Sequence, residues 1–299
     1  NSSGQKRIEI DLEPPDSVNI ESVQFYNRSS SSFQELNNQW YNSDKILISW
    51  IGNDGDSGIG AYSFSLDKNP SEFPDNIPEG KLGELSLKTN HTFTSLTSNN
   101  YTFKIKARDR SGNWMQTFTS TQVKIDNTPP SRPILQSEVF NAQEKSLSYE
   151  WSHAEDISGI VEYKVNLTYI NGSLYRQKTV NALENNCIFS NIDSNNFEAI
   201  VGAKNGAGIW RWSNQEEVVT DVDPPKIISS ISGVIGTKNP NIWIYTSEKA
   251  KCYYKKPGKD FTKFRYTNTT YHESKINLPE GSVDLEINCS DSSGNFNDS

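Results

Sequence analysis

The chain has 299 residues and a formal net charge of −8 at pH 7, which argues against nucleic acid or an anionic membrane as its main partner. At roughly 100–150 residues per domain, this length allows two or three domains. Only 33% of the residues are hydrophobic, but 11% are aromatic and seven are Trp, and disordered chains lack such residues. No apolar run is long enough to span a bilayer, so we expect no transmembrane segment. The composition, rich in Asn, Ser and Thr, predicts an all-β protein of several domains.

The first expected strand lies in residues 8–15, IEIDLEPP, where Ile8, Ile10 and Leu12 alternate with charged residues. An alternation with a period of two is typical of a strand that buries one face. We expect this strand to end at the Pro-Pro pair, because proline cannot donate to a strand ladder.

Strands with the same apolar alternation follow at residues 46–50, 61–66 and 101–107. The loops NDGDSG and DRSGN lie between and after them and supply Gly, Asn and Asp for tight turns. Trp50 closes the first of these strands, and we expect it to fill the core between two sheets.

This pattern repeats along the chain. Trp50 and Trp151 are each followed, at the same offset, by Ser-Gly-Ile. The other matching segments are FKIKARDRSGNW (103–114), EAIVGAKNGAGIW (198–210) and LEINCSDSSGNF (285–296), and the junctions VKIDNTPP (123–130) and VVTDVDPP (218–225). Repeats with about seven short strands each predict antiparallel β-sandwiches. We therefore expect an N-terminal segment at residues 1–15 and three domains, at residues 16–130, 131–225 and 226–299, called here the first, second and third module.

The modules resemble the immunoglobulin-like or fibronectin type III-like repeats of archaeal and bacterial cell-surface proteins. The resemblance is carried by the Trp segment that ends in Ser-Gly-Ile, by the Ala-x-Asp-x-x-Gly-Asn-Trp segment and by the Asp-x-x-Pro-Pro junctions. It covers nearly the whole chain and implies three tandem Ig-like sandwiches and an extracellular, cell-surface location. Such sandwiches serve many functions, so the resemblance specifies the fold better than the role.

The N-terminal segment aligns with the final strand of a complete module, with Ile8 on Val123 and Ile10 on Ile125. The third module, in contrast, lacks its own final strand. One interpretation is donor-strand assembly, in which Ile8, Ile10 and Leu12 of one copy complete the third module of the next. This organisation is similar to that of archaeal thread-like filaments and adhesive pili built of glycosylated Ig-like subunits. The other interpretation is a segment cut from a longer tandem-repeat surface protein, in which the same strand is continuous.

Two of the three cysteines are expected to pair. The repeat alignment places Cys252 and Cys289 on neighbouring strands of the third module, which predicts a disulfide and an oxidising, external compartment. Two buried free thiols are the alternative. Cys187 has no partner in its own module and aligns with His91, so we interpret it as a lone strand residue.

Asn-x-Ser/Thr sequons are frequent. They indicate a glycan coat on an exported chain, although an Asn-rich composition alone also produces them. The candidate acceptors are Asn27, Asn90, Asn100, Asn166, Asn171 and Asn268.

No constellation in the sequence supports catalysis. His91, His153 and His272 fall one in each module, and no nucleophile elbow, Cys-x-x-Cys, His-Glu-x-x-His or phosphate loop occurs. We therefore expect no enzymatic activity and no resident cofactor.

Two groups of residues have both a possible binding role and a structural interpretation. Ca²⁺ prefers carboxylate oxygens and would rigidify the module junctions, although solvated or capping Asp residues are commoner. The acidic residues near the module ends are Asp109, Asp126, Asp221 and Asp223. An aromatic platform for sugars is the second hypothesis, and structural packing of the same side chains is favoured over it. The aromatic residues are Trp40, Tyr41, Trp210 and Trp212.

The sequence thus predicts a structural subunit of an extracellular filament, assembled head to tail for adhesion or cell–cell contact. Its expected partners are identical copies of the chain and, beyond them, glycans of host or neighbouring cell surfaces. One alternative is a fragment of a long tandem-repeat adhesin, stalk or S-layer protein. Another is a set of accessory carbohydrate-binding modules of a secreted hydrolase.

Overall fold

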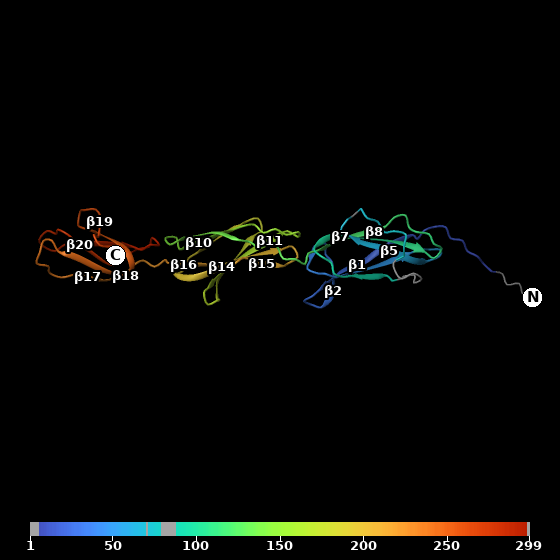
Figure 1. Ribbon diagram of the computed structural model, residues 1–299, viewed down its shortest axis with the longest axis horizontal. Coiled ribbons are helices and arrows are strands. Elements are labelled where there is room, and N and C mark those ends of the chain that lie inside the picture. The colour runs from blue at the N-terminus through green and yellow to red at the C-terminus, as the bar shows by residue number, and fades with distance from the viewer. Residues whose placement is uncertain (1–5, 70, 79–87, 298–299) are drawn as a thin grey trace, which may run out of the picture. The chain divides into compact units, whose positions relative to one another are not determined.

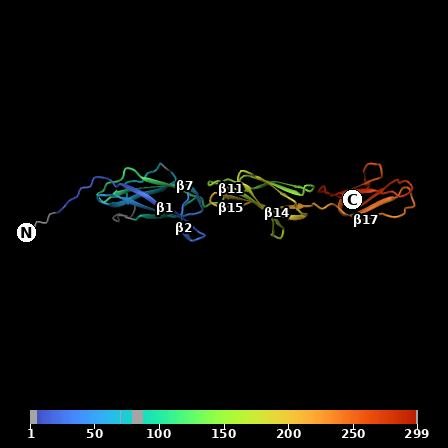
Figure 2. The ribbon, with the colours of Figure 1, turned by 180° about the vertical axis from the view of Figure 1, so that it is seen from behind.

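The computed structural model describes residues 6–69, 71–78 and 88–297, and the regular structure of these residues is entirely β (Figure 1 and, from behind, Figure 2). Within this described part, no helix has the length and apolar character needed to cross a membrane. The chain divides into two compact units. The first comprises Asn1–Arg132, Ala154–Tyr163 and Gly202–Trp212, and the second comprises Pro133–His153, Lys164–Val201 and Ser213–Ser299. The module boundaries drawn from the repeats stay predictions.

The first module consists of two sheets, with strand orders β2-β1-β4-β6 and β3-β8-β7-β5. The strands are β1 (Ser17–Asn27), β2 (Ser32–Glu35), β3 (Trp40–Tyr41), β4 (Ile46–Asn53), β5 (Ile59–Asp67), β6 (Asn90–Phe93), β7 (Asn99–Asp109) and β8 (Thr119–Ile125). All their pairings are antiparallel except the short β3–β8 pair. The expected all-β sandwich is therefore confirmed, with β4, β5 and β7 at the strands predicted from the alternation.

The core of the first module is built around Trp50, which is 1% exposed. Its ring centroid lies 5.8 Å from that of Phe103 in the facing sheet and 5.1 Å from that of Phe64. Phe103 and Ile105 are both 0% exposed, because alternate residues of β7 point to the same face of the sheet. Trp50 thus fills the space between the sheets, as predicted.

The second module has the sheets β13-β10-β9 and β12-β11-β14-β15, with β16 also paired to β14. Its strands are β9 (Leu135–Asn141), β10 (Ser146–Trp151), β11 (Ile160–Tyr169), β12 (Leu174–Asn181), β13 (Asn186–Ser190), β14 (Asn195–Asn205), β15 (Trp210–Trp212) and β16 (Glu216–Thr220). Trp151 is 0% exposed and occupies the end of β10 as Trp50 occupies β4. The repeat in the sequence is therefore a repeat in the structure.

The third module is organised by one long strand, β18 (Asn241–Lys255). The first part of β18 pairs with β17 and β20, and its second part pairs with β19 and β21. The other strands are β17 (Ile227–Ser230), β19 (Thr262–Lys263), β20 (Thr269–Lys275), β21 (Glu286–Ser290) and β22 (Phe296–Asn297). Ile242, Ile244 and Phe264 are buried in its core.

Cys252 of β18 and Cys289 of β21 form a disulfide, as predicted, across directly opposed positions of the two strands. The bond spans a sequence separation of 37 residues, and both side chains are fully buried. Cys187 of β13 is buried and free. Burial raises the pKa of its thiol to about 11, so this thiol stays protonated and unreactive at neutral pH.

His272 of β20 lies in the same core with an exposed fraction of 0%. Its Nε2 lies 3.0 Å from Thr246 Oγ1, and its Nδ1 lies 2.7 Å from Thr267 Oγ1. Burial lowers the pKa of the imidazole to about 4, so the ring is neutral at pH 7. His272 is therefore a hydrogen-bonded core histidine.

Replacing Cys252 and Cys289 together by Ala should destabilise the third module by about 4 kcal/mol, because a cross-link over 37 residues restricts the unfolded chain. Urea titration followed by hydrogen exchange of β18 and β21 measures this free energy. Cys187→Ala is the control. It should leave the unfolding transition of the third module unchanged, because Cys187 lies in β13 of the second module. An unchanged midpoint in the double variant contradicts the prediction.

The third module should lose stability as the pH falls from about 6.5 towards 4. The lowered pKa keeps His272 neutral in the folded state, whereas the unfolded chain binds a proton near pH 6.5. Unfolding therefore takes up a proton in this range, and the free energy of unfolding should fall by at most about 3 kcal/mol. Urea unfolding across this pH range tests it. His272→Asn should flatten the profile, and an equally steep profile in that variant speaks against the assignment.

Candidate functional site

One edge of the third-module sheet, along β21, is incompletely paired. β21 corresponds to β7 and β14, since Cys289 aligns with Ala107 and Ala203. β7 pairs with β5 along one edge and with β8 along the other, and β14 pairs along one edge with β16. β21 pairs with β18 along one edge, while β22 meets it at Cys289 and Ser290. Residues 282–285 belong to no strand, so in the described part of the third module nothing occupies the position of β8 and β16.

The side chains next to this edge are incompletely buried as well. Val283 and Leu285 correspond to Tyr101 and Phe103 of the first module, which are 5% and 0% exposed. In the third module both positions are only half-buried, and Leu285 packs at the margin of the core. One more apolar strand would cover them. We call residues 282–287 the open edge.

The N-terminal segment presents the apolar side chains that such a strand requires. Ile8, Ile10 and Leu12 are 84%, 81% and 79% exposed. Their counterparts at the end of the second module are Val218, Thr220 and Val222, at 4%, 2% and 9%. Among the described residues of this segment, 6–15 form no strand, because an isolated extended segment has no edge with which to pair its backbone groups. Its role as a donor strand stays a prediction.

From Asp11 onwards the segment is held against the first module. Asn113, in the turn after β7, donates from Nδ2 to the carbonyl oxygens of Asp11 and Glu13, at 3.3 Å and 3.2 Å. Asn295 does the same in the third module, donating to the carbonyl oxygen of Asp221 at 2.9 Å. Residues 6–10, in contrast, are all exposed.

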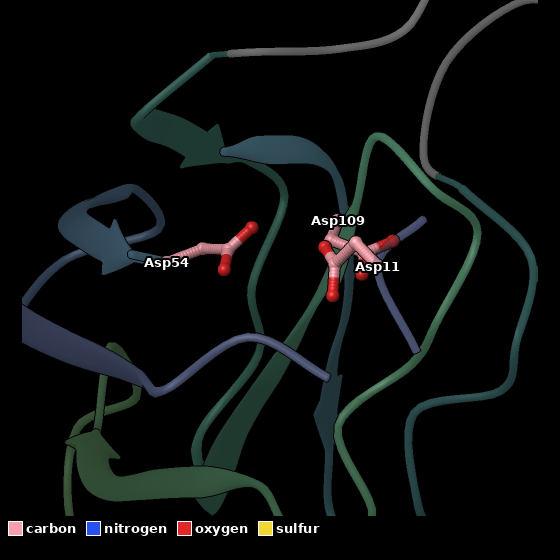
Figure 3. Close-up of side chains that lie close together, drawn as sticks. All are labelled: Asp11, Asp54 and Asp109. Carbon is pink, nitrogen blue, oxygen red and sulfur yellow. The ribbon is translucent and has the colours of Figure 1, made fainter. Parts of the chain in front are cut away.

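Acidic residues gather where each linker meets the next module. The first two clusters combine a linker residue, a residue from the loop after β4 or β10, and the last residue of β7 or β14. In the third cluster, Glu248 lies within β18 and Asp291 directly follows β21. The clusters are Asp11, Asp54 and Asp109 (Figure 3), then Asp126, Asp156 and Asn205, and finally Asp221, Glu248 and Asp291. Each cluster lies within one compact unit.

The middle cluster is closed by hydrogen bonds. Asn205, which is 0% exposed, donates from Nδ2 to Asp126 Oδ2 at 2.8 Å and to Asp156 Oδ2 at 3.2 Å. Ser158 donates to Asp126 Oδ2 at 2.7 Å, and Ser98 donates to Asp126 Oδ1 at 2.9 Å. The buried carboxylate of Asp126 and the half-buried carboxylate of Asp156 thus both accept from neutral donors.

The clusters shift the pKa values of their members in different directions. Burial acts to raise the pKa of Asp126, but the hydrogen bonds from Ser158, Asp156 and Ser98 hold it below its usual value. Burial and the hydrogen bond with Asp126 raise the pKa of Asp156. Burial, followed by the charges of the neighbouring aspartates, raises the pKa of Glu248. The middle pair therefore concentrates its charge on Asp126, the carboxylate with the most donors.

The acidic residues that the sequence suggested as Ca²⁺ ligands do not form one site, but lie in different clusters. Asp109, Asp126 and Asp221 each belong to one of the three, and Asp223 belongs to none. Sequence reasoning missed Asp11, Asp54, Asp156, Glu248 and Asp291 as their partners. The sequence offers one indication of these partners, because an acidic residue follows both Trp50 and Trp151 within a few positions.

Three of the four aromatic residues considered for sugar binding pack against other rings or backbone, and the fourth, Trp40, is half-buried in β3. The rings of Trp210 and Trp212 are stacked, 5.5 Å apart and 15° from parallel. Trp212 lies so close to Gly202 that a Cβ there would meet its ring at 2.7 Å. Tyr41 is 5% exposed, and its ring centroid lies 4.2 Å from that of Phe25. These contacts favour the packing interpretation.

The candidate glycan acceptors are all at least partly accessible. Asn90, Asn100, Asn171 and Asn268 are exposed, whereas Asn27 and Asn166 are half-buried. Asn166 Oδ1 also accepts a hydrogen bond from Gln177 at 2.8 Å. Attachment of glycans to these residues stays a prediction.

No protein-family model matches the chain, and no curated protein matches it. Among solved structures, the chain is similar to the FN1–FN3 domains of chicken CNTN1, at 14% sequence identity and a TM-score of 0.32, with 95% of this chain and 94% of that chain covered. A similarity at this identity and TM-score carries no argument about this chain. The β-sandwich assignment rests on the chain's own sheets, strand registers and cores.

Replacing Asn205 by Ala should lower the free energy of unfolding by about 1–3 kcal/mol, because the buried Asp126 and the half-buried Asp156 then lose the donor between them. Urea unfolding followed by hydrogen exchange at β8 and β14 measures the change. Asn100→Ala, at an exposed position of β7, is the matched control and should stay within about 0.5 kcal/mol of the parent. Equal effects of the two substitutions would count against the closed middle cluster.

Proposed function

We propose that the chain is a structural, non-enzymatic subunit of an extracellular surface filament that serves adhesion or cell–cell contact. Copies join head to tail when residues 6–12 of one copy add a strand to the open edge of the next. The observation that carries this proposal is the open edge itself, with its half-buried Val283 and Leu285 beside an incompletely paired β21. An exposed strand edge is a template for the addition of another strand, and the alternating Ile8, Ile10 and Leu12 supply a complementary apolar face.

The strand pairings in the other modules suggest a register for the proposed added strand. The relevant antiparallel pairs are Tyr101 with Val123 and Phe197 with Val218. Val283 aligns with Tyr101 and Phe197, and Ile8 aligns with Val123 and Val218. By analogy, these pairings support an antiparallel register in which Ile8 lies opposite Val283.

The energetics favour association. Burial of each large aliphatic side chain contributes about 1.5–3 kcal/mol, in addition to the backbone hydrogen bonds of the new ladder. Donor and acceptor are different surfaces of the chain, so the contact is heterologous and propagates into a filament. The similarity of this organisation to archaeal thread-like filaments supports an archaeal surface protein of this kind.

Other features support the proposed location. The Cys252–Cys289 disulfide is typical of an oxidising compartment. The exposed sequons are positioned to carry glycans, and a glycan coat suits a surface subunit. Beyond copies of itself, the filament would contact glycans of neighbouring or host cells.

The variant Ile8→Ser with Ile10→Ser tests the proposal. Loss of two buried aliphatic side chains should weaken association by roughly 10²–10⁴-fold, from about 1.5–3 kcal/mol each. Sedimentation velocity and electron microscopy measure the assembly, with Glu9→Ser, on the opposite face of the strand, as the matched control. Unchanged assembly of the double variant would contradict the proposal.

The register has its own test. Ile8→Cys combined with Val283→Cys should cross-link copies into a covalent ladder under oxidising conditions, visible on non-reducing gels. Glu9→Cys with Val283→Cys is the control, because Glu9 points to the other face. A chain that stays monomeric with the Ile8 pair favours the alternative of a continuous tandem-repeat protein.

A further inference from the structure

The outer face of the third module carries a group of aromatic side chains. Ile242 and Ile244 of β18 are buried in the core. The alternate residues Trp243 and Tyr245 therefore point outwards. Tyr271 of β20 lies directly opposite Tyr245 and shares this face. Three rings thus lie side by side on the outer side of the sheet.

A fourth ring extends this group. Tyr266 precedes β20 and pairs with Glu273, which lies two positions after Tyr271 on the same face. Successive ring centroids lie 5.8, 5.0 and 6.0 Å apart along the aromatic row, which consists of Trp243, Tyr245, Tyr271 and Tyr266. The row ends at its most exposed ring, because Tyr266 is 57% exposed.

The fold itself does not require aromatic residues at these positions. Counted from the pairing with the preceding strand, the positions of β4 and β10 that correspond to Trp243 and Tyr245 are not aromatic. They hold Leu47 and Ser49 in β4, and Ser148 and Glu150 in β10. A contiguous patch of exposed rings indicates a surface that another group covers.

One glycan acceptor predicted from the sequence lies beside this row. Asn268 follows Tyr266 by two residues and precedes Tyr271 by three. Thr270 completes its Asn-x-Thr sequon. Asn268 is exposed, and its φ of 70° places it in a turn. Its backbone N–H donates to the carbonyl oxygen of Ala250 at 2.9 Å, so this turn is fixed to β18.

An exposed ring at this distance distinguishes Asn268 from the other predicted acceptors. Asn27 and Asn171 also follow aromatic residues by two positions, namely Phe25 and Tyr169. Those two rings are half-buried, whereas the ring before Asn268 is 57% exposed. No aromatic residue stands at this distance before the remaining acceptors, Asn90, Asn100 and Asn166.

We propose that Asn268 carries a glycan whose first sugar packs on the rings of Tyr266 and Tyr271 and stabilises the third module. A pyranose sugar presents C–H groups on one face and hydroxyl groups around its rim. It therefore covers an aromatic ring while its hydroxyl groups stay hydrated. Glu273, beside Tyr266, adds a carboxylate that accepts hydrogen bonds from such hydroxyl groups. The inference rests on the glycan coat of the proposed function and gives one glycan of that coat a structural role.

Attachment to the chain is what makes this contact effective. A free sugar would bind one or two rings weakly, because association costs translational and rotational freedom. A sugar held at Asn268 has already lost this freedom, so the contact is intramolecular. The attached glycan is therefore favoured over a free saccharide or a partner protein as the group that covers this end of the aromatic row.

Occupancy of Asn268 is the first test. The full chain is secreted from a host that attaches N-linked glycans, digested and analysed by mass spectrometry, and Asn268 should carry a glycan. Thr270→Ala should remove this glycan alone, while Asn268 itself stays in its turn. An empty Asn268 beside other occupied acceptors overturns the inference and leaves the glycan coat standing. If every acceptor is empty, the glycan coat fails as well.

The packing is tested through the stability of the third module. Urea unfolding followed by hydrogen exchange of β18 compares the glycosylated parent with Thr270→Ala. The glycan should lower the unfolding equilibrium constant roughly 3–10-fold, which is the contribution expected of one contact between rings. The same substitution in a chain produced without glycosylation measures the contribution of the Thr270 side chain, which is then subtracted.

Tyr266→Ser identifies the ring that the sugar contacts. In this variant, loss of the glycan should change the unfolding equilibrium constant by no more than about twofold. Phe261→Ser is the matched control, because Phe261 is an exposed aromatic residue of the third module outside the aromatic row, and it should keep the full effect. A glycan that does not stabilise the parent, or whose effect survives Tyr266→Ser, contradicts the proposal. Assembly is scored separately by sedimentation.

Discussion

Backbone hydrogen bonding along both edges of one strand is the constraint on which each module depends. β7 meets this requirement with β5 and β8, and its apolar face is then fully covered, as Phe103 and Ile105 show. Where the second partner is missing, as beside β21, the same positions are covered only in part. Pairing and core burial are therefore one event in this fold, because the strand that supplies the hydrogen bonds also supplies the side chains that close the core.

Polar interactions are the second constraint, and they act where the linkers meet the modules. Each linker contributes a carboxylate to a cluster in the module that follows it, and the clusters differ in the residue at or directly after the end of the strand equivalent to β7. Asn205 provides an amide donor in the middle of the chain, whereas Asp109 and Asp291 provide further negative charge. One exchange of oxygen for nitrogen thus distinguishes the cluster that contains its own amide donor from the two clusters that consist of carboxylates alone.

The sequence predicts the strands well and the clusters poorly, for physical reasons. Alternation over residues 46–50 and 101–107 identifies β4 and β7, since a period of two follows directly from strand geometry. The disulfide follows because the repeat alignment puts Cys252 and Cys289 on neighbouring strands. The clusters depend on loop geometry, and Asp156 lies one residue further from its Trp than Asp54 does. Alternation in residues 8–15 likewise specifies an apolar face without specifying an edge to receive it.

The position of the disulfide has a mechanical consequence. It joins β21, which borders the open edge, to β18, the longest strand of the third module. Tension applied to β21 passes through a covalent bond into β18 and from there into every strand paired with it. β21 therefore cannot be peeled from its own sheet one hydrogen bond at a time. A load on this edge is therefore carried by the third-module sheet as a whole.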